Sequence, residues 1–309
     1  MSDNIKLCSQ CILPFGYPKT KFDTIDGKLI CEHCQTYNII KPSREELLSQ
    51  WERCVVRMKQ YRNENNAEYD AVMAYSGGKD STVALYLCIK KYGLRILAYT
   101  VNHGFITNKT QKNIQHVLDD LGVDWYFIQD DHKDNVKKHI DNFEYPCGYG
   151  KICTDVMKKY FSQVPKIFKT PFILTGCEVL FDGKAVLERD EYIHINVPAA
   201  LSLQREESLE IVKNLHWEHP GYFDPECYIP GMTDCIIPGI ALEKIYTQQG
   251  YGYEDIFSNR IETGLLDYVA VRVRQGACDR EEILLKLKKG FHCSQEAWDE
   301  YNHIFNPEN

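Results

Sequence analysis

The stretch AVMAYSGGKDSTVALYL, residues 71–87, decides how the rest of the chain is organised. An apolar run from Ala71 to Tyr75 stops at the turn SGGKDS (76–81), and a helical pattern of apolar residues follows directly. A strand, a Gly-rich turn and a helix in this order gather backbone amides and a helix N-terminus around one point, which favours anions. Two adjacent glycines permit a positive φ and close backbone approach. The stretch therefore predicts a loop that binds a phosphate chain.

Six residues of this turn are the candidate nucleotide-binding residues. They are Ser76, Gly77, Gly78, Lys79, Asp80 and Ser81. Their spacing is not that of a Walker A loop. It resembles the SGGxDS signature of the PP-loop ATP pyrophosphatases, whose fixed positions all match; an ordinary Ser/Gly turn is the alternative.

That resemblance implies a reaction as well as a ligand. In the family, ATP with Mg²⁺ is split between its α- and β-phosphates, a substrate oxygen is adenylated, and nitrogen or sulfur then displaces AMP. Lys79 and Asp80 are therefore expected to act in catalysis. The implied fold is α/β, a doubly wound parallel sheet of the adenine nucleotide alpha hydrolase type.

Composition narrows the class of protein. The chain has 309 residues with 44% hydrophobic and 26% charged, and its net charge of −8 weighs against a broad nucleic-acid surface. Since no run approaches the ~18 apolar residues of a membrane helix and the N-terminus lacks an apolar signal segment, we expect a cytoplasmic protein without membrane contact. Thirteen cysteines in such a chain favour metal binding or reactive sulfur over disulfides.

Four of these cysteines form two pairs near the N-terminus. Cys8-x-x-Cys11 and Cys31-x-x-Cys34 are separated by nineteen residues, which is typical of a four-thiolate zinc site. A segment this short cannot fold on apolar burial alone. We therefore predict a zinc knuckle with Zn²⁺ on Cys8, Cys11, Cys31 and Cys34; a redox pair or an iron–sulfur site is the alternative.

The same segment carries a second resemblance. The sequence CSQCILPFGYPKTKFDTIDGKLICEHC (8–34) is similar to the N-terminal segment of the N-acetyl sugar amidotransferases, PP-loop proteins of bacterial surface-sugar and nonulosonate pathways. The likeness covers residues 8–105 well and recurs weakly at 274–287. It implies amidation of a sugar carboxylate or acetamido group with ammonia from a glutaminase partner. The chain shows no evident glutaminase domain, so we expect a separate protein or free ammonia.

Further strands complete the predicted nucleotide domain. Segments 96–101, 125–128 and 172–175 are rich in strand-forming residues and alternate with helical patterns, which predicts a parallel sheet. Asn102 and His103 follow one of these strands, at the edge where ligands bind, so we expect them beside adenosine or substrate. A turn with a capping Asn is the alternative. The predicted parts are a zinc knuckle (1–42), a linker helix (43–66), the PP-loop domain (67–195) and a helical C-terminal substrate or partner region (196–309).

Three central cysteines leave the donor chemistry open. Cys147 and Cys153 lie in a loop that runs into a helix, and Cys153 is expected near the helix N-terminus, where the dipole lowers a thiol pKa. Cys177 ends the last strand of the domain. The three could carry a persulfide, bind an iron–sulfur cluster, form a second metal site or simply pack. Cys153 and Cys177 are the candidate catalytic thiols, and Glu178 and Asp182 are candidate ligands for Mg²⁺.

The C-terminal third offers fewer signals. Residues 220–239 form a Pro- and Gly-punctuated loop, long enough for a substrate lid or a partner surface, and four helices are predicted after it. Arg272 and Arg274 could bind an anion, although a solvated face also explains them. His216 and His219 flank Trp217 without metal spacing.

Three functions follow from these observations. The first is amidation of a small, sugar-type substrate. The second is sulfur transfer to tRNA or a small molecule, with a sulfur-donor protein as partner and Cys147, Cys153 and Cys177 as persulfide carriers or cluster ligands. The third is a zinc-knuckle protein that senses nucleotide without turnover.

Overall fold

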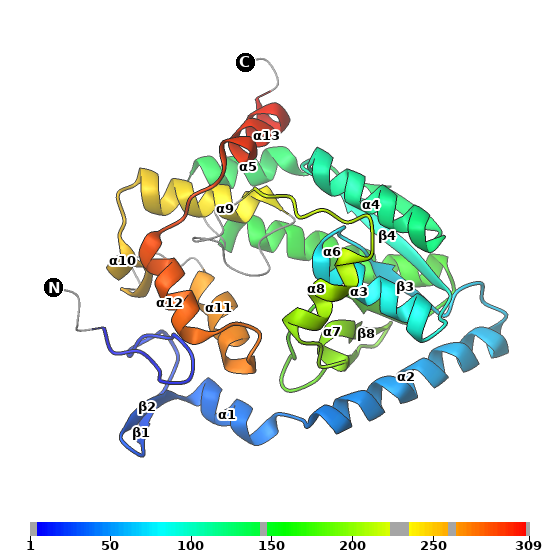
Figure 1. The fold of residues 1–309 in the computed structure, drawn as a ribbon, viewed down its shortest axis with the longest axis horizontal. Helices are drawn as coiled ribbons and strands as arrows, with labels where there is room; N and C mark the ends of the chain where they lie inside the picture. Colours follow the sequence, from blue (N-terminus) through cyan, green and yellow to red (C-terminus); the bar gives the residue numbers. More distant parts are fainter. Residues whose placement is uncertain (1–4, 143–146, 223–234, 259–263, 307–309) are drawn as a thin grey trace. The chain divides into compact units, whose positions relative to one another are not determined.

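A computed structural model describes residues 5–142, 147–222, 235–258 and 264–306 (Figure 1). The chain divides into two compact units. Unit 2 consists of Pro42–Asp131 and Thr154–Pro220, and unit 1 consists of Met1–Lys41, His132–Cys153 and Gly221–Asn309. The predicted division into four parts stays a prediction.

A six-stranded sheet forms the centre of unit 2. Its strands are β3 (Ala71–Ala74), β4 (Ile96–Asn102), β5 (Trp125–Gln129), β6 (Phe172–Thr175), β7 (Val186–Glu188) and β8 (Ile193–Asn196). They lie in the order β5-β4-β3-β6-β8-β7, and every neighbouring pair is parallel except the antiparallel pair β7–β8. The predicted α/β fold with a parallel sheet is confirmed. The short strands β7 and β8 were not predicted.

The strand order has one point of reversal. From β3 the chain builds β4 and β5 on one side, and it later returns to place β6 and then β8 on the other side. β3 and β6 are therefore neighbours although about a hundred residues separate them in sequence. Open α/β sheets bind ligands at such a reversal, beyond the carboxyl ends of the strands.

Helices cover both faces of the sheet. On one face Val72 and Ile173 pack with Tyr160 of α6 (Cys147–Ile167) in a buried cluster. Alternate residues of a strand face opposite sides of the sheet. On the other face, the ring of Phe172 packs against that of Tyr61 from α2 (Arg44–Asn65), with ring centroids 5.8 Å apart. A capping box on Ser43 starts α2, as the sequence predicts.

The described part of unit 2 has four further helices. They are α3 (Lys79–Tyr86) with its π-helical extension Leu87–Lys91, α4 (Asn108–Leu121), α7 (Val197–Ala200) and α8 (Arg205–Lys213). Helix α3 contacts both α7 and α8 (Figure 1). Since α3 begins directly after the loop that follows β3, these contacts fix the helix whose N-terminus borders the loop.

Unit 1 contains a small hairpin and a helical region. Its elements are β1 (Phe22–Ile25), β2 (Lys28–Cys31), α1 (Glu32–Ile40), α5 (Lys133–Asp141), α9 (Ile236–Leu242) with the π-helical Glu243–Gln248, α10 (Tyr253–Phe257), α11 (Leu265–Gln275), α12 (Arg280–Lys289) and α13 (Gln295–Phe305). The predicted hairpin and helical C-terminal region are confirmed. Residues 223–234 of the expected loop lie outside the described residues, and α9 begins at Ile236, inside the range expected to be loop. None of the helices described combines the length and apolar character that a membrane span requires.

Candidate nucleotide site and metal centre

The loop 76–81 joins β3 to α3 and has a specific backbone shape. Gly77 has φ +80°, and a Cβ at this position would lie 2.5 Å from Cγ1 of the buried Ile114, so only glycine fits. The hydroxyls of Ser76 and Ser81 lie 3.1 Å apart, and Ser81 Oγ donates to the Gly78 carbonyl at 3.0 Å. The amide of Gly78 donates to Ser76 Oγ at 3.3 Å. The loop is thus closed on itself by its own serines.

The first turn of α3 presents donors without an internal acceptor. The first four amides of any helix lack an intrahelical partner, and no side chain caps α3 at Gly78. Lys79 and Asp80, in that first turn, form an ion pair that keeps the ammonium group of Lys79 at the helix N-terminus. Amides, a helix dipole and one lysine together suit a phosphate group.

The loop lies at the point where the strand order of the sheet reverses, and the chain that follows β6 packs against it. Gly176 follows β6, and a Cβ there would lie 2.5 Å from Cα of Ser81. The backbone after β6 therefore touches the backbone at the start of α3. Any larger residue at Gly176 would push the loop away from its position.

Cys177 and the carboxylates considered for Mg²⁺ continue from Gly176. Cys177 Sγ is half-buried and lies 3.9 Å from the Val179 carbonyl. Asp182 has φ +50° in a turn closed by hydrogen bonds between Phe181 and Lys184. The structure gives Glu178 and Asp182 no grouping with a third ligand; within the described ranges only the four N-terminal cysteines form such a group.

Asn102 and His103 lie at the end of β4, next to β3. Asn102 Oδ1 accepts from the amide of Gly104 at 3.1 Å, and its Nδ2 donates to Gln129 Oε1 at 2.9 Å. His103 stacks on Phe105 with ring centroids 3.6 Å apart. Both residues thus stand at the same edge of the sheet as the loop, as predicted, and their binding role stays a prediction.

The expected environment of Cys153 is wrong. Helix α6 begins at Cys147, six residues earlier, so Cys153 lies in its second turn and not at its N-terminus. Burial raises the pKa of the Cys153 thiol to about 11, opposite to the expected lowering, and His132 Nε2 lies 3.7 Å from its sulfur. Cys153 and Cys177 belong to different units, and the side chain of Cys147 lies outside the described residues. The predicted convergence of the three cysteines stays a prediction.

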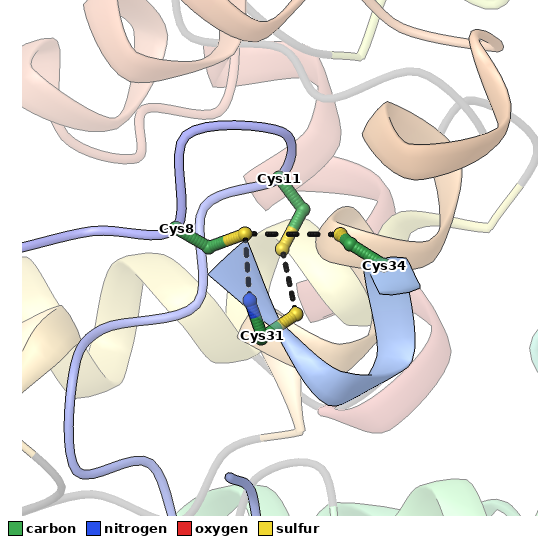
Figure 2. Close-up of side chains that lie close together, drawn as sticks. All are labelled: Cys8, Cys11, Cys31 and Cys34. Carbon is green, nitrogen blue, oxygen red and sulfur yellow. Dashed lines mark hydrogen bonds between the residues drawn. The ribbon is translucent and has the colours of Figure 1, made fainter. Parts of the chain in front are cut away.

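The four N-terminal cysteines meet at one point. Cys8 and Cys11 come from a loop, Cys31 ends β2 and Cys34 lies in α1, and their sulfurs face one another (Figure 2). All four are buried, and their sulfurs lie within 4.8 Å of one another, with 3.7 Å between Cys8 and Cys34 and between Cys11 and Cys31.

This spacing fits a single metal ion. A zinc ion with Zn–S distances of about 2.3 Å holds tetrahedral sulfurs about 3.8 Å apart. An iron–sulfur cluster inserts several iron and sulfide atoms between its cysteine ligands, which separates them further. The donor set can hold zinc or iron, and its spacing favours one zinc ion.

Two arginines from the C-terminal helices contact the cysteine site. Arg274 Nε of α11 donates to Cys34 Sγ at 3.4 Å. Arg280 of α12 donates to the carbonyls of Cys11 at 2.8 Å and of Cys8 at 3.3 Å. Arg274 therefore serves the cysteine site rather than a free anion, which corrects the expectation from the sequence. The Cζ atom of Arg272 lies 3.6 Å from the centroid of the Tyr268 ring, over its face.

Curated relatives are few and do not reveal a function. The chain is 28% identical over 287 residues to the uncharacterized protein MJ1599 of Methanocaldococcus jannaschii, covering 91% of this chain and 93% of that protein. It is 24% identical to the uncharacterized protein MJ1638 of the same organism, over 60% of this chain and 64% of that one. No protein-family model matches the chain.

Solved structures with distant similarity include three proteins. NMN synthetase from Francisella tularensis has a TM-score of 0.39 at 14% identity and covers 87% of this chain and 95% of its own. U34-tRNA thiolase NcsA from Methanococcus maripaludis, with its [4Fe-4S] cluster, has a TM-score of 0.38 at 17% identity, with 88% of each chain covered. A predicted subunit of tRNA methyltransferase from Methanocaldococcus jannaschii has a TM-score of 0.34 at 19% identity, over 59% of this chain and 88% of its own. At such low TM-scores, what these proteins bind or make says nothing by itself about this chain.

Sequence reasoning missed the long-range contacts of these sites, two of which involve Trp217 and Arg274. Trp217 donates to the Gly77 carbonyl at 2.9 Å, although 140 positions of sequence separate the two residues. Arg274 donates to Cys34, which lies 240 positions earlier in the sequence. Neither lies in a motif with a fixed spacing from its partner. The nearest signal in the sequence was the weak likeness of residues 274–287 to the N-acetyl sugar amidotransferases, the same family that the segment with the cysteine pairs resembles.

Proposed function

We propose that the chain is an ATP pyrophosphatase-type enzyme that binds ATP with Mg²⁺ on the loop 76–81 and forms AMP and pyrophosphate. The observation that carries this proposal is the place of the SGGKDS signature. It stands at the reversal point of a parallel sheet, where such folds bind ligands, and its amides border an uncapped helix N-terminus.

Each loop residue has a role in this proposal. The amides at the start of α3 and the ammonium group of Lys79 hold the leaving pyrophosphate, and Asp80 keeps Lys79 in place. A substrate oxygen attacks the α-phosphorus, the bond between that phosphorus and the bridging oxygen breaks, and the electron pair leaves with pyrophosphate. Mg²⁺ comes bound to the phosphates and needs at most one or two protein carboxylates. Catalysis is then mainly positioning and charge stabilisation.

The first choice of acceptor is a sugar-type carboxylate or acetamido group that becomes amidated. The likeness of residues 8–34 to the N-acetyl sugar amidotransferases supports this choice. So does the raised pKa of Cys153, because a thiol with a pKa of about 11 is protonated at neutral pH and is a poor sulfur nucleophile. Ammonia comes from a separate glutaminase or from solution.

Sulfur transfer is the second candidate, and the position of Cys177 favours it. Cys177 directly follows Gly176, whose backbone touches Ser81 of the loop. The terminal sulfur of a persulfide on Cys177 would start next to the bound nucleotide, attack the adenylated carbon of a tRNA base or small molecule and expel AMP; a thiol reductant would then cleave the S–S bond that joins the product to Cys177. A sulfur-donor protein would be the partner in that case.

The four-cysteine site has a structural role in both proposals. Zinc there would hold the hairpin β1–β2 and helix α1 together, since this segment is too small to fold by burial alone. When bound, the ion supplies folding free energy and no step of the reaction.

The experiment measures AMP formed from ATP with panels of sugar acids and N-acetyl sugars, with ammonium or with a persulfide donor. We expect AMP with an amide product in ammonium, and no AMP from Lys79→Ala. Cys177→Ser should leave amidation intact. If wild type forms a thiolated product with the persulfide donor and Cys177→Ser does not, while the amide product is unaffected, the second candidate is established instead. ATP binding without AMP for any acceptor would favour the nucleotide-sensing alternative.

A further inference from the structure

A short segment of unit 2, residues 216–220, runs along one face of α4. Asn113 binds its backbone twice, since Nδ2 donates to the Glu218 carbonyl at 2.7 Å and Oδ1 accepts from the Glu218 amide at 3.0 Å. Lys109 Nζ donates to the Pro220 carbonyl at 2.9 Å. Asp120 Oδ2 accepts from the amide of His216 at 3.1 Å. We call residues 216–220 the strap.

The spacing of these contacts fixes the direction of the strap. Lys109, Asn113 and Asp120 are four and seven residues apart on α4, so they share one helix face. The backbone of the strap is therefore held at both ends, His216 and Pro220, and in the middle, at Glu218. Trp217 lies between the strap residues His216 and Glu218, whose backbones α4 holds.

Trp217 reaches the nucleotide loop from this strap. Its Nε1 donates to the Gly77 carbonyl at 2.9 Å, a normal hydrogen-bond length. The loop carbonyl that it holds belongs to the peptide between Gly77 and Gly78. In a trans peptide the C=O and the N–H point in opposite directions, so this bond also fixes the direction of the Gly78 amide.

The Gly77–Gly78 peptide needs such a restraint. A peptide flip changes ψ of the first residue and φ of the second, and glycine at both positions makes this change sterically cheap. The Gly78 amide itself donates to Ser76 Oγ at a long 3.3 Å, which is a weak restraint on this peptide. If this peptide flipped, the Gly77 carbonyl oxygen would take the place of the Gly78 amide. An oxygen acceptor would then face the phosphate that the amide should bind.

We propose that Trp217 is a positioning residue that locks the Gly77–Gly78 peptide in its phosphate-binding orientation. The inference rests on the proposed function, that this loop binds the phosphates of ATP. The strap then acts as part of the nucleotide site, although it lies outside the SGGKDS signature. The strap is anchored on α4, and Ile114 of the same helix lies next to Gly77.

The test compares ATP and adenosine binding by calorimetry in wild type and Trp217→Phe, which keeps an aromatic ring and removes the donor. One hydrogen bond of this kind corresponds to roughly 3- to 10-fold in affinity. We expect ATP to bind that much more weakly and adenosine to bind as before, because adenosine lacks the phosphates that the loop holds. The matched control is Trp298→Phe, which removes an indole bond to Glu243 in unit 1 and should change neither affinity.

Each outcome bears on the proposal. Unchanged ATP affinity in Trp217→Phe overturns it, and so does an equal loss for ATP and adenosine, which would indicate general damage to the site. Failure of wild type to bind ATP removes the proposed function first and this inference with it. Should Trp217→Phe not fold, Asn113→Ala releases the middle of the strap and should weaken ATP but not adenosine; equal affinities there would also refute the lock.

Discussion

Replacing Gly176 by alanine tests whether close packing of β6 against the loop positions the nucleotide site. A Cβ at Gly176 would lie 2.5 Å from Cα of Ser81, and both partners are backbone, so neither can swing aside. Restoring an ordinary contact of about 3.4 Å needs a shift of about 0.9 Å in the loop or in the end of β6. Overpacking of this kind costs about 1–3 kcal/mol in the free energy of unfolding.

The functional effect of Gly176→Ala should exceed its effect on stability. A misplacement of about 1 Å in a positioning site can reduce the rate by about 100-fold. We expect the free energy of unfolding in urea to fall by about 1–3 kcal/mol and AMP formation to fall at least tenfold at a temperature where the variant is folded.

The control for this prediction is Gly252→Ala in unit 1. Gly252 has φ −101°, and a Cβ there would have only Asp255 Oδ2 within 4 Å, at 3.9 Å. Its ATP affinity and rate should match wild type. Wild-type affinity and rate in Gly176→Ala would refute the argument that this contact sets the loop.

Other predictions concern the metal centre and pH. Arg274→Gln should speed the loss of metal to a chelator by about 10- to 100-fold, because the guanidinium no longer offsets the charge on Cys34, whereas Arg272→Gln should not; equal rates would contradict this role. Burial lowers the pKa of His194 to about 4 from 6.5, so the unfolded chain binds the additional proton and the free energy of unfolding should fall by about 3 kcal/mol as pH falls from 6.5 to 4. His194→Gln should lose less stability than wild type over that range in urea titrations, and the same loss in both would refute the assignment.

The sequence predicted the parts of the fold that depend on local patterns. The apolar run before Ser76 and the helical pattern after Ser81 placed a strand and a helix where the structure has β3 and α3. The cysteine spacing predicted the four buried sulfurs, because two tight turns can close a tetrahedron wherever the rest of the chain lies. These features depend on neighbours within a few tens of residues.

Features that depend on distant contacts were not predictable in the same way. The strand β8 reads IHIN, too short and too polar for a pattern to identify, and it forms because β6 provides a parallel partner. Burial of Cys153 in the second turn of α6 reverses the effect that a helix N-terminus would have had on its pKa. Trp217 carries no local signal, since its partner lies 140 residues away.

The central claim is that the loop directs cleavage between the α- and β-phosphates of ATP. The most direct measurement separates the nucleotide products by chromatography after incubation of the protein with ATP, Mg²⁺ and the acceptor panel, and it quantifies pyrophosphate in the same samples. We expect AMP and pyrophosphate in equal amounts, with neither formed by Lys79→Ala. ADP with inorganic phosphate as the enzymatic products, again lost in Lys79→Ala, would contradict the claim, because the loop would then act on the terminal phosphate.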